Sequence, residues 1–406
     1  MPPKEIRIDR FTGLDNVTPP ELREPGALDT ADNVDIDQLG KIRRRKGATR
    51  VYNRGSHSLW SDGSLCLFRQ GANLNRLNAD FSATALRSAI AGSNRMNYLA
   101  LNGLVYFTDD ITAGIIQDGS ARSWGLEVPP EPVLSETAGD LPEGRYQVSL
   151  TYCRKDYQES GASRTVYIDI SEGGIEISSI PVSSDPAVQW VNVYLSTTNG
   201  EALYLARTLP NGTTSTTYKA PGGEVNLPLK TQALCAPFPG QLLEFYNGRI
   251  YIARDNFLFP TEPMNYELID SMAAIPFPGR ITLLAPVEDG IWLSIEGQET
   301  VFLSGDQPQS FKLLSRAPYS AIEGTARKIN AKLLKDTELQ GDLWIWGSSR
   351  GICLGAPGGA FSNLTHKKYS YPFSQSGSAL VREERGMVHY LLSMDNAIQA
   401  AFNAYS

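Results

Sequence analysis

A turn glycine followed by an alternating strand recurs six times in this chain of 406 residues, and it constrains the fold more than any other feature. The six stretches are "DGSLCLF" (62–68), "NGLVYFT" (102–108), "NGRIYIA" (247–253), "DGIWLSI" (289–295), "GDLWIWG" (341–347) and "RGMVHYL" (385–391). Each predicts a hairpin turn that leads into a half-buried strand. Successive glycines are 40, 145, 42, 51 and 45 residues apart. A period of about 40 to 50 residues is typical of the four-stranded blades of a β-propeller.

The single long step predicts a second domain inserted into the propeller. It equals one blade plus roughly 100 residues, and the excess falls between Gly103 and Gly248. Six or seven short alternating strands follow the proline-rich stretch "EVPPEPV" (127–133), which is typical of a β-sandwich. We therefore expect an all-β fold with four parts: an N-terminal arm and hairpin (1–50), the first part of a β-propeller (51–126), an inserted sandwich (127–226) and the remainder of the propeller (227–406).

The inserted segment resembles the fibronectin type III family. The stretch "LPEGRYQVSLTYCRKDYQESGASRTVYI" (141–168) is similar to the second and third strands of that family with their acidic, serine-rich connection. The lone Cys153 agrees with the resemblance, because that family lacks the inter-sheet disulfide of antibody domains. The resemblance implies an adhesive or spacing module and no chemical activity.

Alternation within the insertion predicts which side chains enter its core. Tyr146, Val148, Leu150 and Tyr152 share one face of the first long strand, and Val191, Val193 and Leu195 share one face of a later strand. Trp190 and Tyr194 then lie on the opposite face. We expect these two aromatic residues to cover the propeller or a partner subunit, although single outward aromatic residues are also common on ordinary surfaces.

Charge and chain chemistry argue against several functions. The net charge of -7 and pI near 5.2 argue against a protein that wraps nucleic acid. The start lacks the apolar segment of a secretory signal, and no run approaches the roughly 20 apolar residues of a membrane span. We expect a soluble protein that is made in the cytoplasm and has no membrane anchor.

The usual sequence patterns of catalytic sites and metal sites do not occur in this chain. His57, His366 and His389 have no second histidine or cysteine at ligand spacing, and no phosphate-binding loop or dinucleotide fingerprint occurs. The cysteines Cys66, Cys153, Cys235 and Cys353 are far apart and are predicted to be buried free thiols. The acids Asp289, Glu296 and Glu299, considered as a glycosidase pair, lie beside exposed-looking turns. We expect no metal, no cofactor and no enzymatic activity.

The stretch "ADNVDIDQLGKIRRRKG" (31–47) places acids before a turn at Gly40 and a basic cluster after it. The cluster consists of Arg43, Arg44, Arg45 and Lys46. One interpretation is a self-complementary hairpin, because opposite charges across an antiparallel pair attract and charges on an edge strand discourage wrong pairing. The other is an interface with a neighbouring subunit or adaptor, where arginines pair with carboxylates.

The N-terminal stretch 11–52 resembles the signature of bacteriophage tail nozzle proteins, also called tail tubular B or head-completion stabilisation proteins. The matching residues are Gly13, Leu14, Asn16, Pro25, Ala27, Asn33, Asp35, Gly40, Ile42, Arg43, Arg44, Arg45 and Gly47. Lys46 replaces the usual proline and Ile42 the usual leucine. The stretches 248–270 and 279–305 are also similar to that family.

This second resemblance implies a structural protein of the virion. Nozzle proteins resemble complete or incomplete propellers and assemble as a ring, typically of six subunits, below the portal and adaptor. The ring retains the packaged genome, and double-stranded DNA later passes through its lumen without sequence-specific binding. An acidic wall suits that passage because it repels phosphates. The basic cluster would then face a neighbouring copy or the adaptor.

Two other classes of function stay open at this stage. A baseplate or fibre-attachment protein would use propeller and sandwich loops against host surface glycans, and a cryptic glycan hydrolase would use acids that converge from distant blades. Neither needs the N-terminal signature, so that signature favours the nozzle. We also expect 397–406 to pair with an early strand near 58–68 and so to close the propeller.

Overall fold

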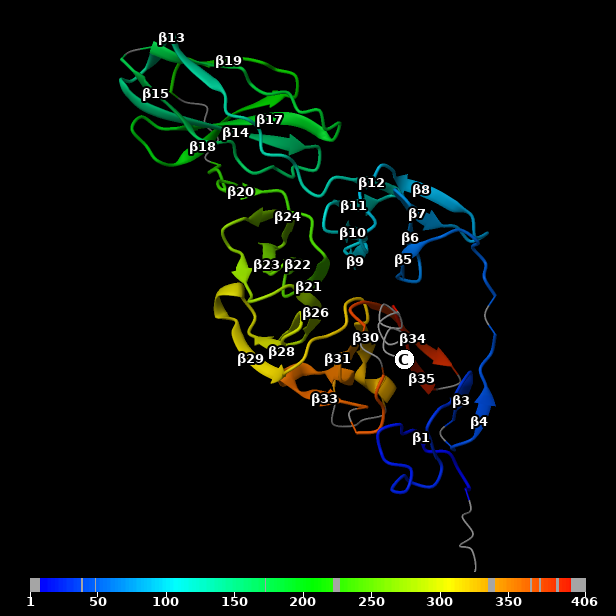
Figure 1. Cartoon of the computed structure of the whole chain (residues 1–406). Coiled ribbons are helices and arrows are strands. Elements are labelled where there is room, and N and C mark those ends of the chain that lie inside the picture. The colour runs from blue at the N-terminus through cyan, green and yellow to red at the C-terminus, as the bar shows by residue number, and fades with distance from the viewer. Residues whose placement is uncertain are drawn as a thin grey trace, which may run out of the picture. The chain divides into compact units, whose positions relative to one another are not determined.

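The structure is a computed structural model that describes residues 8–37, 39–47, 49–171, 173–221, 227–334, 340–365, 367–371, 374–384 and 387–395. Within these ranges the regular structure is β-strand with three short 3-10 helices and no α-helix, so the prediction of an all-β chain is confirmed. The strands form many small sheets (Figure 1). Two compact units are present: unit 1 contains Met1–Ala85, Asp255–Phe257 and Pro276–Ser406, and unit 2 contains Leu86–Arg254 and Leu258–Ile275.

Unit 1 holds the N-terminal arm and three four-stranded antiparallel sheets. The arm contains β1 (Gly13–Leu14), β2 (Ala27–Leu28), β3 (Val34–Ile36) and β4 (Ile42–Arg44). The sheets consist of β5 (His57–Ser61), β6 (Cys66–Gln70), β7 (Asn73–Leu77) and β8 (Ala83–Arg87); β26 (Ile281–Val287), β27 (Gly290–Ile295), β28 (Thr300–Ser304) and β29 (Lys312–Ala317); and β30 (Arg327–Asn330), β31 (Asp342–Ser348), β32 (Gly351–Gly355) and β33 (Phe361–Asn363). The hairpin β34 (Gly377–Glu384) and β35 (Met387–Met394) follows, and the 3-10 helices are η1 (Pro308–Ser310), η2 (Ala331–Leu334) and η3 (Pro357–Gly359).

Unit 2 holds two further sheets of the same kind and a body of two sheets between them in sequence. The first sheet consists of β9 (Asn97–Leu101), β10 (Leu104–Thr108), β11 (Ala113–Gln117) and β12 (Ser120–Arg122). The second contains β21 (Leu242–Tyr246), β22 (Arg249–Arg254), β23 (Phe257–Glu262) and β24 (Asn265–Asp270), with β20 (Leu234–Cys235) on β24 and β25 (Ile275–Pro276) on β23.

The recurring glycines occupy the same place in the five sheets outside the two-sheet body that contain four consecutive strands. Gly63, Gly103, Gly248, Gly290 and Gly341 lie at the connection between the first and second strands. At Gly103 and Gly248 both turn residues have positive φ, since Asn102 is at +52° and Asn247 at +42°. This is the Asn-Gly geometry that matches the twist of a hairpin. The predicted hairpins are therefore confirmed at Gly63, Gly103, Gly248 and Gly290. At Gly341 the two strands pair as in a hairpin, but their connection contains η2 and residues outside the described ranges, and Gly386 also lies outside them.

The two-sheet body spans the strands from 133 to 218, inside the predicted limits of 127–226. One sheet has the order β13-β16-β19, formed by β13 (Val133–Leu141), β16 (Gly173–Ser178) and β19 (Thr216–Tyr218). The other has the order β15-β14-β17-β18, formed by β15 (Val166–Ile170), β14 (Gly144–Arg154), β17 (Val188–Ser196) and β18 (Leu203–Pro210). Both sheets contribute to one hydrophobic core.

That core contains every side chain that the alternation assigned to it. Tyr146, Val148, Leu150, Tyr152, Val191, Val193 and Leu195 are all buried in it. The assignment of 144–154 and 166–170 as second and third fibronectin strands is wrong, because those strands lie in opposite sheets of an immunoglobulin-type sandwich. Here β14 pairs directly with β15, from Gly144 opposite Ile170 to Val148 opposite Val166. Alternation predicts the face of the sheet on which a side chain lies, but it does not predict which strand pairs with its own.

The four cysteines are free thiols, as predicted, but only two are buried. Burial raises the pKa of the Cys353 thiol to about 11 and that of Cys153 to about 11. Cys66 and Cys235 are half-buried, so the prediction of burial is wrong for this pair. The segment expected to close a propeller, 397–406, lies outside the described residues.

Candidate functional site: the basic hairpin and the ionic junction

The acidic and basic arms of the N-terminal segment form one antiparallel hairpin, drawn side by side as β3 and β4 in Figure 1. Asp35 lies opposite Arg43, and Ile36 lies opposite Ile42. Gly40 makes the turn at φ +75°, where a Cβ atom would come within 2.6 Å of the Arg10 Cβ. The prediction of a turn at Gly40 between arms of opposite charge is therefore confirmed.

Two of the three arginines are neutralised within the hairpin. Arg45 Nε lies 3.0 Å from Asp35 Oδ1, and Arg43 Nη2 lies 3.2 Å from Asp37 Oδ2. Asp37 also accepts the main-chain N–H of Lys41 at 2.9 Å, and this hydrogen bond is the main reason that the pKa of Asp37 is lowered. Within the described ranges Arg44 forms no ion pair, and its side chain is exposed. Self-complementarity thus accounts for Arg43 and Arg45, while a role of the cluster at an interface stays a prediction.

Residues of the N-terminal signature hold this hairpin in place. Gly13 and Leu14 in β1 pair in parallel with Ala27 and Leu28 in β2. The N–H of Phe11 donates to the carbonyl of Gly40 at 2.9 Å, which ties the hairpin turn to the start of the arm. The matched glycines and apolar residues therefore build the frame on which the basic strand is presented.

The arm is also attached to the C-terminal part of unit 1. The N–H of Asn16 donates to the carbonyl of Lys368 at 2.9 Å, and its side-chain amide bonds both the N–H and the carbonyl of Ser370. A weaker contact joins Arg382 Nη2 to Asp35 Oδ2 at 3.9 Å. Asn16 and Asp35 both belong to the N-terminal signature, so two of its polar residues serve this attachment.

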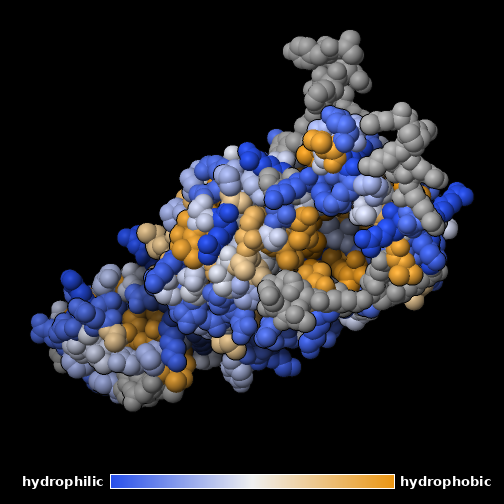
Figure 2. All heavy atoms as spheres, turned by 90° about the horizontal axis from the view of Figure 1, so that it is seen from below, coloured by the Kyte–Doolittle hydropathy of each residue, from blue (hydrophilic) through white to orange (hydrophobic). Residues whose placement is uncertain are grey.

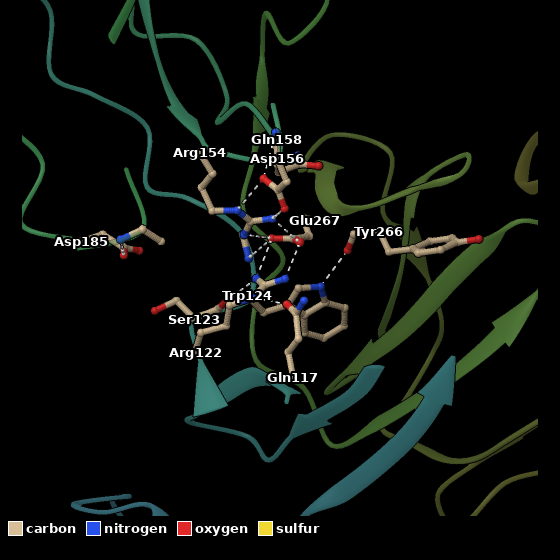
Figure 3. Close-up of polar contacts among 12 residues, drawn as sticks. Gln117, Arg122, Ser123, Trp124, Arg154, Asp156, Gln158, Asp185, Tyr266 and Glu267 are labelled. Atoms are coloured by element: carbon tan, nitrogen blue, oxygen red, sulfur yellow. Dashed lines mark hydrogen bonds and ion pairs between the residues drawn. The ribbon is translucent and has the colours of Figure 1, made fainter. Parts of the chain in front are cut away.

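A buried ionic junction lies in unit 2, where the two-sheet body adjoins β12 and β24 (Figure 3). Glu267 in β24 accepts hydrogen bonds from Arg154 Nη1 at 2.6 Å and Nη2 at 2.8 Å. It also accepts Arg122 Nη1 at 3.0 Å and Nη2 at 2.9 Å, and the N–H of Gly125 at 3.2 Å. Asp156 accepts Arg154 Nε at 3.2 Å and Nη2 at 3.0 Å. Two cations thus face two carboxylates with paired geometry.

The junction is balanced in charge, and its central pair is shielded from water, whereas the Asp156 side chain is exposed. The side chains of Arg154 and Glu267 are 8% and 9% exposed. Burial acts to raise the pKa of Glu267, but the hydrogen bonds from Arg154 and Arg122 outweigh it, so the pKa is lowered. Burial, with a smaller contribution from the Glu267 charge, raises the pKa of Tyr106 nearby to about 12. These features fit a fixed structural connection between the two-sheet body and its flanking sheets.

The two aromatic residues expected at an interface have different settings. Tyr194 is 4% exposed, and its hydroxyl donates to Glu159 Oε1 at 2.8 Å, so it is an internal residue and does not present a surface to a partner. The partner-subunit alternative is therefore wrong for Tyr194, because Glu159 covers its hydroxyl on the outward face of β17, and alternation alone does not reveal this. Trp190 is half-buried and stacks on Tyr157, with ring centroids 5.9 Å apart and planes at 13°.

The described residues offer little that indicates other chemistry. No group of three or more His, Cys, Asp or Glu side chains that could hold a metal ion occurs among them. Asp289, one of the acids considered for glycoside hydrolysis, accepts the N–H of Gly358 at 3.0 and 2.8 Å and so fixes the loop that contains η3. None of the helices in the described ranges is long and apolar enough to cross a membrane.

Comparison with known proteins gives no family. No protein-family model matches the chain, and no curated protein sequence matches it. Among solved structures, one of BBS1N in complex with ARL6DN is 10% identical, with 84% of this chain and 92% of that chain covered and a TM-score of 0.30. PorZ, a surface component of the type-IX secretion system of Porphyromonas gingivalis, is 11% identical over 86% of this chain and 52% of that chain, at a TM-score of 0.23.

A third solved structure is the computationally designed Ika8 protein, which is 8% identical over 85% of this chain and 97% of that chain, at a TM-score of 0.23. Because all three TM-scores are far below 0.5, these likenesses carry no conclusion about topology or function.

Proposed function

We propose that the four-stranded sheets are blades of a β-propeller and that the two-sheet body is a sandwich inserted into it. Five sheets share the same antiparallel order of consecutive strands and the same glycine position in the first turn. The insertion begins after one complete sheet, β9–β12, and ends before the next, β21–β24. A domain inserted between blades leaves every blade whole, which supports this division.

We propose that the protein is a structural component of a bacteriophage tail, a nozzle-like ring below the portal and adaptor that forms part of the DNA exit channel. One observation carries this proposal. The residues that match the nozzle signature build the arm that carries the basic strand: Gly13 and Leu14 pair with β2, Gly40 makes the hairpin turn and is bonded to Phe11, and Asn16 fixes the arm to Lys368 and Ser370. A signature whose residues hold one strand exposed at the surface suits a protein that functions by assembling with other subunits.

The charge of the chain supports the same proposal. With 44 acidic and 37 basic residues, the chain has few cations to spare for gripping a phosphate backbone. Moreover, two arginines of its most basic segment are already paired with Asp35 and Asp37. A tube that repels phosphates lets duplex DNA slide, whereas a basic tube would hold it through counterion release.

The location of the chain in phage particles tests this function. Antibodies against the purified chain, coupled to gold, should label particles at the junction of head and tail. Label on the baseplate or fibres would instead favour the host-attachment protein that binds surface glycans, and absence from purified particles would refute both assignments. An antibody against a known capsid protein serves as the positive control for access and labelling.

A further inference from the structure

The outer edge of β4 offers unpaired main-chain groups. In an antiparallel pair, residues alternate between those whose N–H and C=O face the partner strand and those whose groups face away. The N–H of Asp37 donates to Lys41 O at 3.0 Å, and the N–H of Arg45 donates to Asn33 O at 2.9 Å. Residues 41, 43 and 45 therefore bond to β3, and the N–H and C=O groups of Ile42 and Arg44 point away from it.

Nothing in the described ranges covers this edge. The sheet contains two strands, β3 and β4, and all three residues of β4 are exposed. Beside the edge, Leu39 is 72% exposed and Ile42 is 38% exposed. Figure 2 shows that the face in view is mostly hydrophilic, with hydrophobic residues gathered in patches. An open edge with apolar neighbours is a template for another strand.

Hydrogen bonds also brace the turn beside the edge. Gly40 is bonded to Phe11, and Asp37 caps the turn by accepting the N–H groups of Leu39 and Lys41 at 3.0 and 2.9 Å. Isolated two-stranded hairpins are only marginally stable in water, so this bracing preserves the edge in the conformation that a third strand needs. Binding to such an edge loses little conformational entropy.

Charge determines which strand can occupy the edge. The segment has five cations, Lys41, Arg43, Arg44, Arg45 and Lys46, whose charge Asp35 and Asp37 offset only in part, so it is positive whereas the chain as a whole is acidic. Two copies of β4 cannot pair with each other, because like charges would lie opposite one another. The strand that adds must carry carboxylates, and the rest of an acidic chain supplies them. A contact between two different surfaces of identical chains is heterologous, and such contacts close into rings when the rotation permits.

We propose that the outer edge of β4 receives an acidic edge strand from a second copy of this chain, and that repetition of this heterologous contact builds the ring. The inference rests on the proposed function and names its subunit contact. Main-chain hydrogen bonds of Ile42 and Arg44 give the affinity, and the guanidinium of Arg44, which forms no ion pair within the described ranges, selects the acidic partner.

Proline at position 42 tests the contact directly. The Ile42 N–H makes no bond to β3, so Ile42→Pro leaves the hairpin intact while it removes a donor from the outer edge. Ile42→Ala keeps the N–H and serves as the matched control. Native mass spectrometry of the full chain should show multi-subunit rings for the wild type and Ile42→Ala. For Ile42→Pro we expect the subunit contact to weaken about tenfold or more, which shifts the population to monomer.

A second variant tests the same contact in case the proline variant misfolds. Arg44→Glu keeps every main-chain group but repels an acidic strand, so rings should again dissociate. Hydrogen exchange provides a third measure: the amides of residues 42 and 44 should be protected in the ring and exchange rapidly after dilution to monomer. Arg43→Pro, which removes an N–H that bonds to Asp35, should instead disrupt the hairpin itself.

The outcomes separate this inference from the proposed function. Rings that survive Ile42→Pro and Arg44→Glu, a wild-type chain that stays monomeric at every concentration, or rings that form only after another virion protein is added would each overturn the inference. The gold label at the junction of head and tail is independent of all three results. Label elsewhere would refute the nozzle assignment even if the edge-strand contact is found.

Discussion

Asn16 and Ser370, 354 residues apart in sequence, form a reciprocal pair of hydrogen bonds: Asn16 Nδ2 donates to Ser370 O at 2.8 Å, and Ser370 N donates to Asn16 Oδ1 at 2.8 Å. A side-chain amide here occupies the place that a peptide group of a neighbouring strand would take. The amide of asparagine offers a donor and an acceptor side by side in one planar group. The clamp therefore explains chemically why an asparagine suits this position of the N-terminal signature.

Asn16→Ala should release the arm without unfolding unit 1. The variant loses two side-chain hydrogen bonds at a solvent-exposed site, which should reduce stability by only about 1 kcal/mol. Limited proteolysis should nevertheless cut within residues 8–47 much faster than in the wild type. Val17→Ala, at an exposed neighbour with no part in the clamp, is the control. Equal protection of both variants would show that the arm is held by other contacts.

Removing the carboxylate of Glu267 should be strongly destabilising. Glu267→Ala leaves Arg122 and Arg154 without their shared partner, and breaking a buried ion pair in this way costs about 3 to 5 kcal/mol. Denaturant unfolding monitored by tryptophan fluorescence measures the loss. The control is Asp169→Asn, which breaks the equally bidentate but exposed pair with Arg145, and its midpoint should not change measurably. Similar behaviour of the two variants would contradict a structural role of the junction.

The same junction predicts how stability depends on pH. The pKa of Glu267 is lowered in the folded state from its ordinary value of 4.5. Its contribution to stability is therefore fully present above about pH 4.5 and is lost as the pH falls through the lowered pKa. Urea melts should show stability falling more steeply below that pH in the wild type than in Glu267→Gln, whose side chain does not titrate. Parallel curves for the two proteins would contradict this assignment of acid sensitivity.

The sequence predicted what depends on local pattern and missed what depends on distant partners. Alternation placed Val148 and Leu150 in a core, and the charge order around Gly40 predicted the hairpin, because both follow from neighbours along one strand. Arg154 and Glu267 are 113 residues apart, and nothing in either neighbourhood indicates that they meet.

The prediction that Tyr194 contacts a partner subunit is wrong for the same reason, since Glu159, which is distant along the chain, covers its side chain. Arg154 stands at the end of an otherwise buried strand, and a buried arginine needs a partner, but the sequence does not show which residue that partner is.

Tyr194→Phe should lower stability while leaving any ring intact. The hydroxyl of Tyr194 donates to Glu159, and Asn192 Nδ2 and Thr151 Oγ1 donate to the same carboxylate. Removal of one part-buried hydrogen bond to a charged acceptor should cost about 1.5 kcal/mol. Thermal unfolding and native mass spectrometry measure the two effects separately. Loss of the ring with unchanged stability would return Tyr194 to the interface that the sequence analysis assigned to it.

Duplex DNA should pass this protein without being retained. Non-specific affinity for DNA comes from the release of counterions by unpaired cations, and Arg43 and Arg45 already face Asp37 and Asp35. We therefore expect no shift of a duplex in gel electrophoresis at about 0.15 M salt, where the screening length is ~8 Å.

A double variant supplies the matched comparison, because Asp35→Asn with Asp37→Asn frees both arginines and keeps the turn-capping acceptors in place. That variant should bind duplex DNA at low salt, and each phosphate it newly contacts should steepen the slope of log affinity against log salt by about 0.9. Retention of DNA by the wild-type chain at physiological salt would contradict an acidic channel wall. Equal, weak binding by both proteins would show that pairing with Asp35 and Asp37 is not what keeps Arg45 and Arg43 from binding DNA.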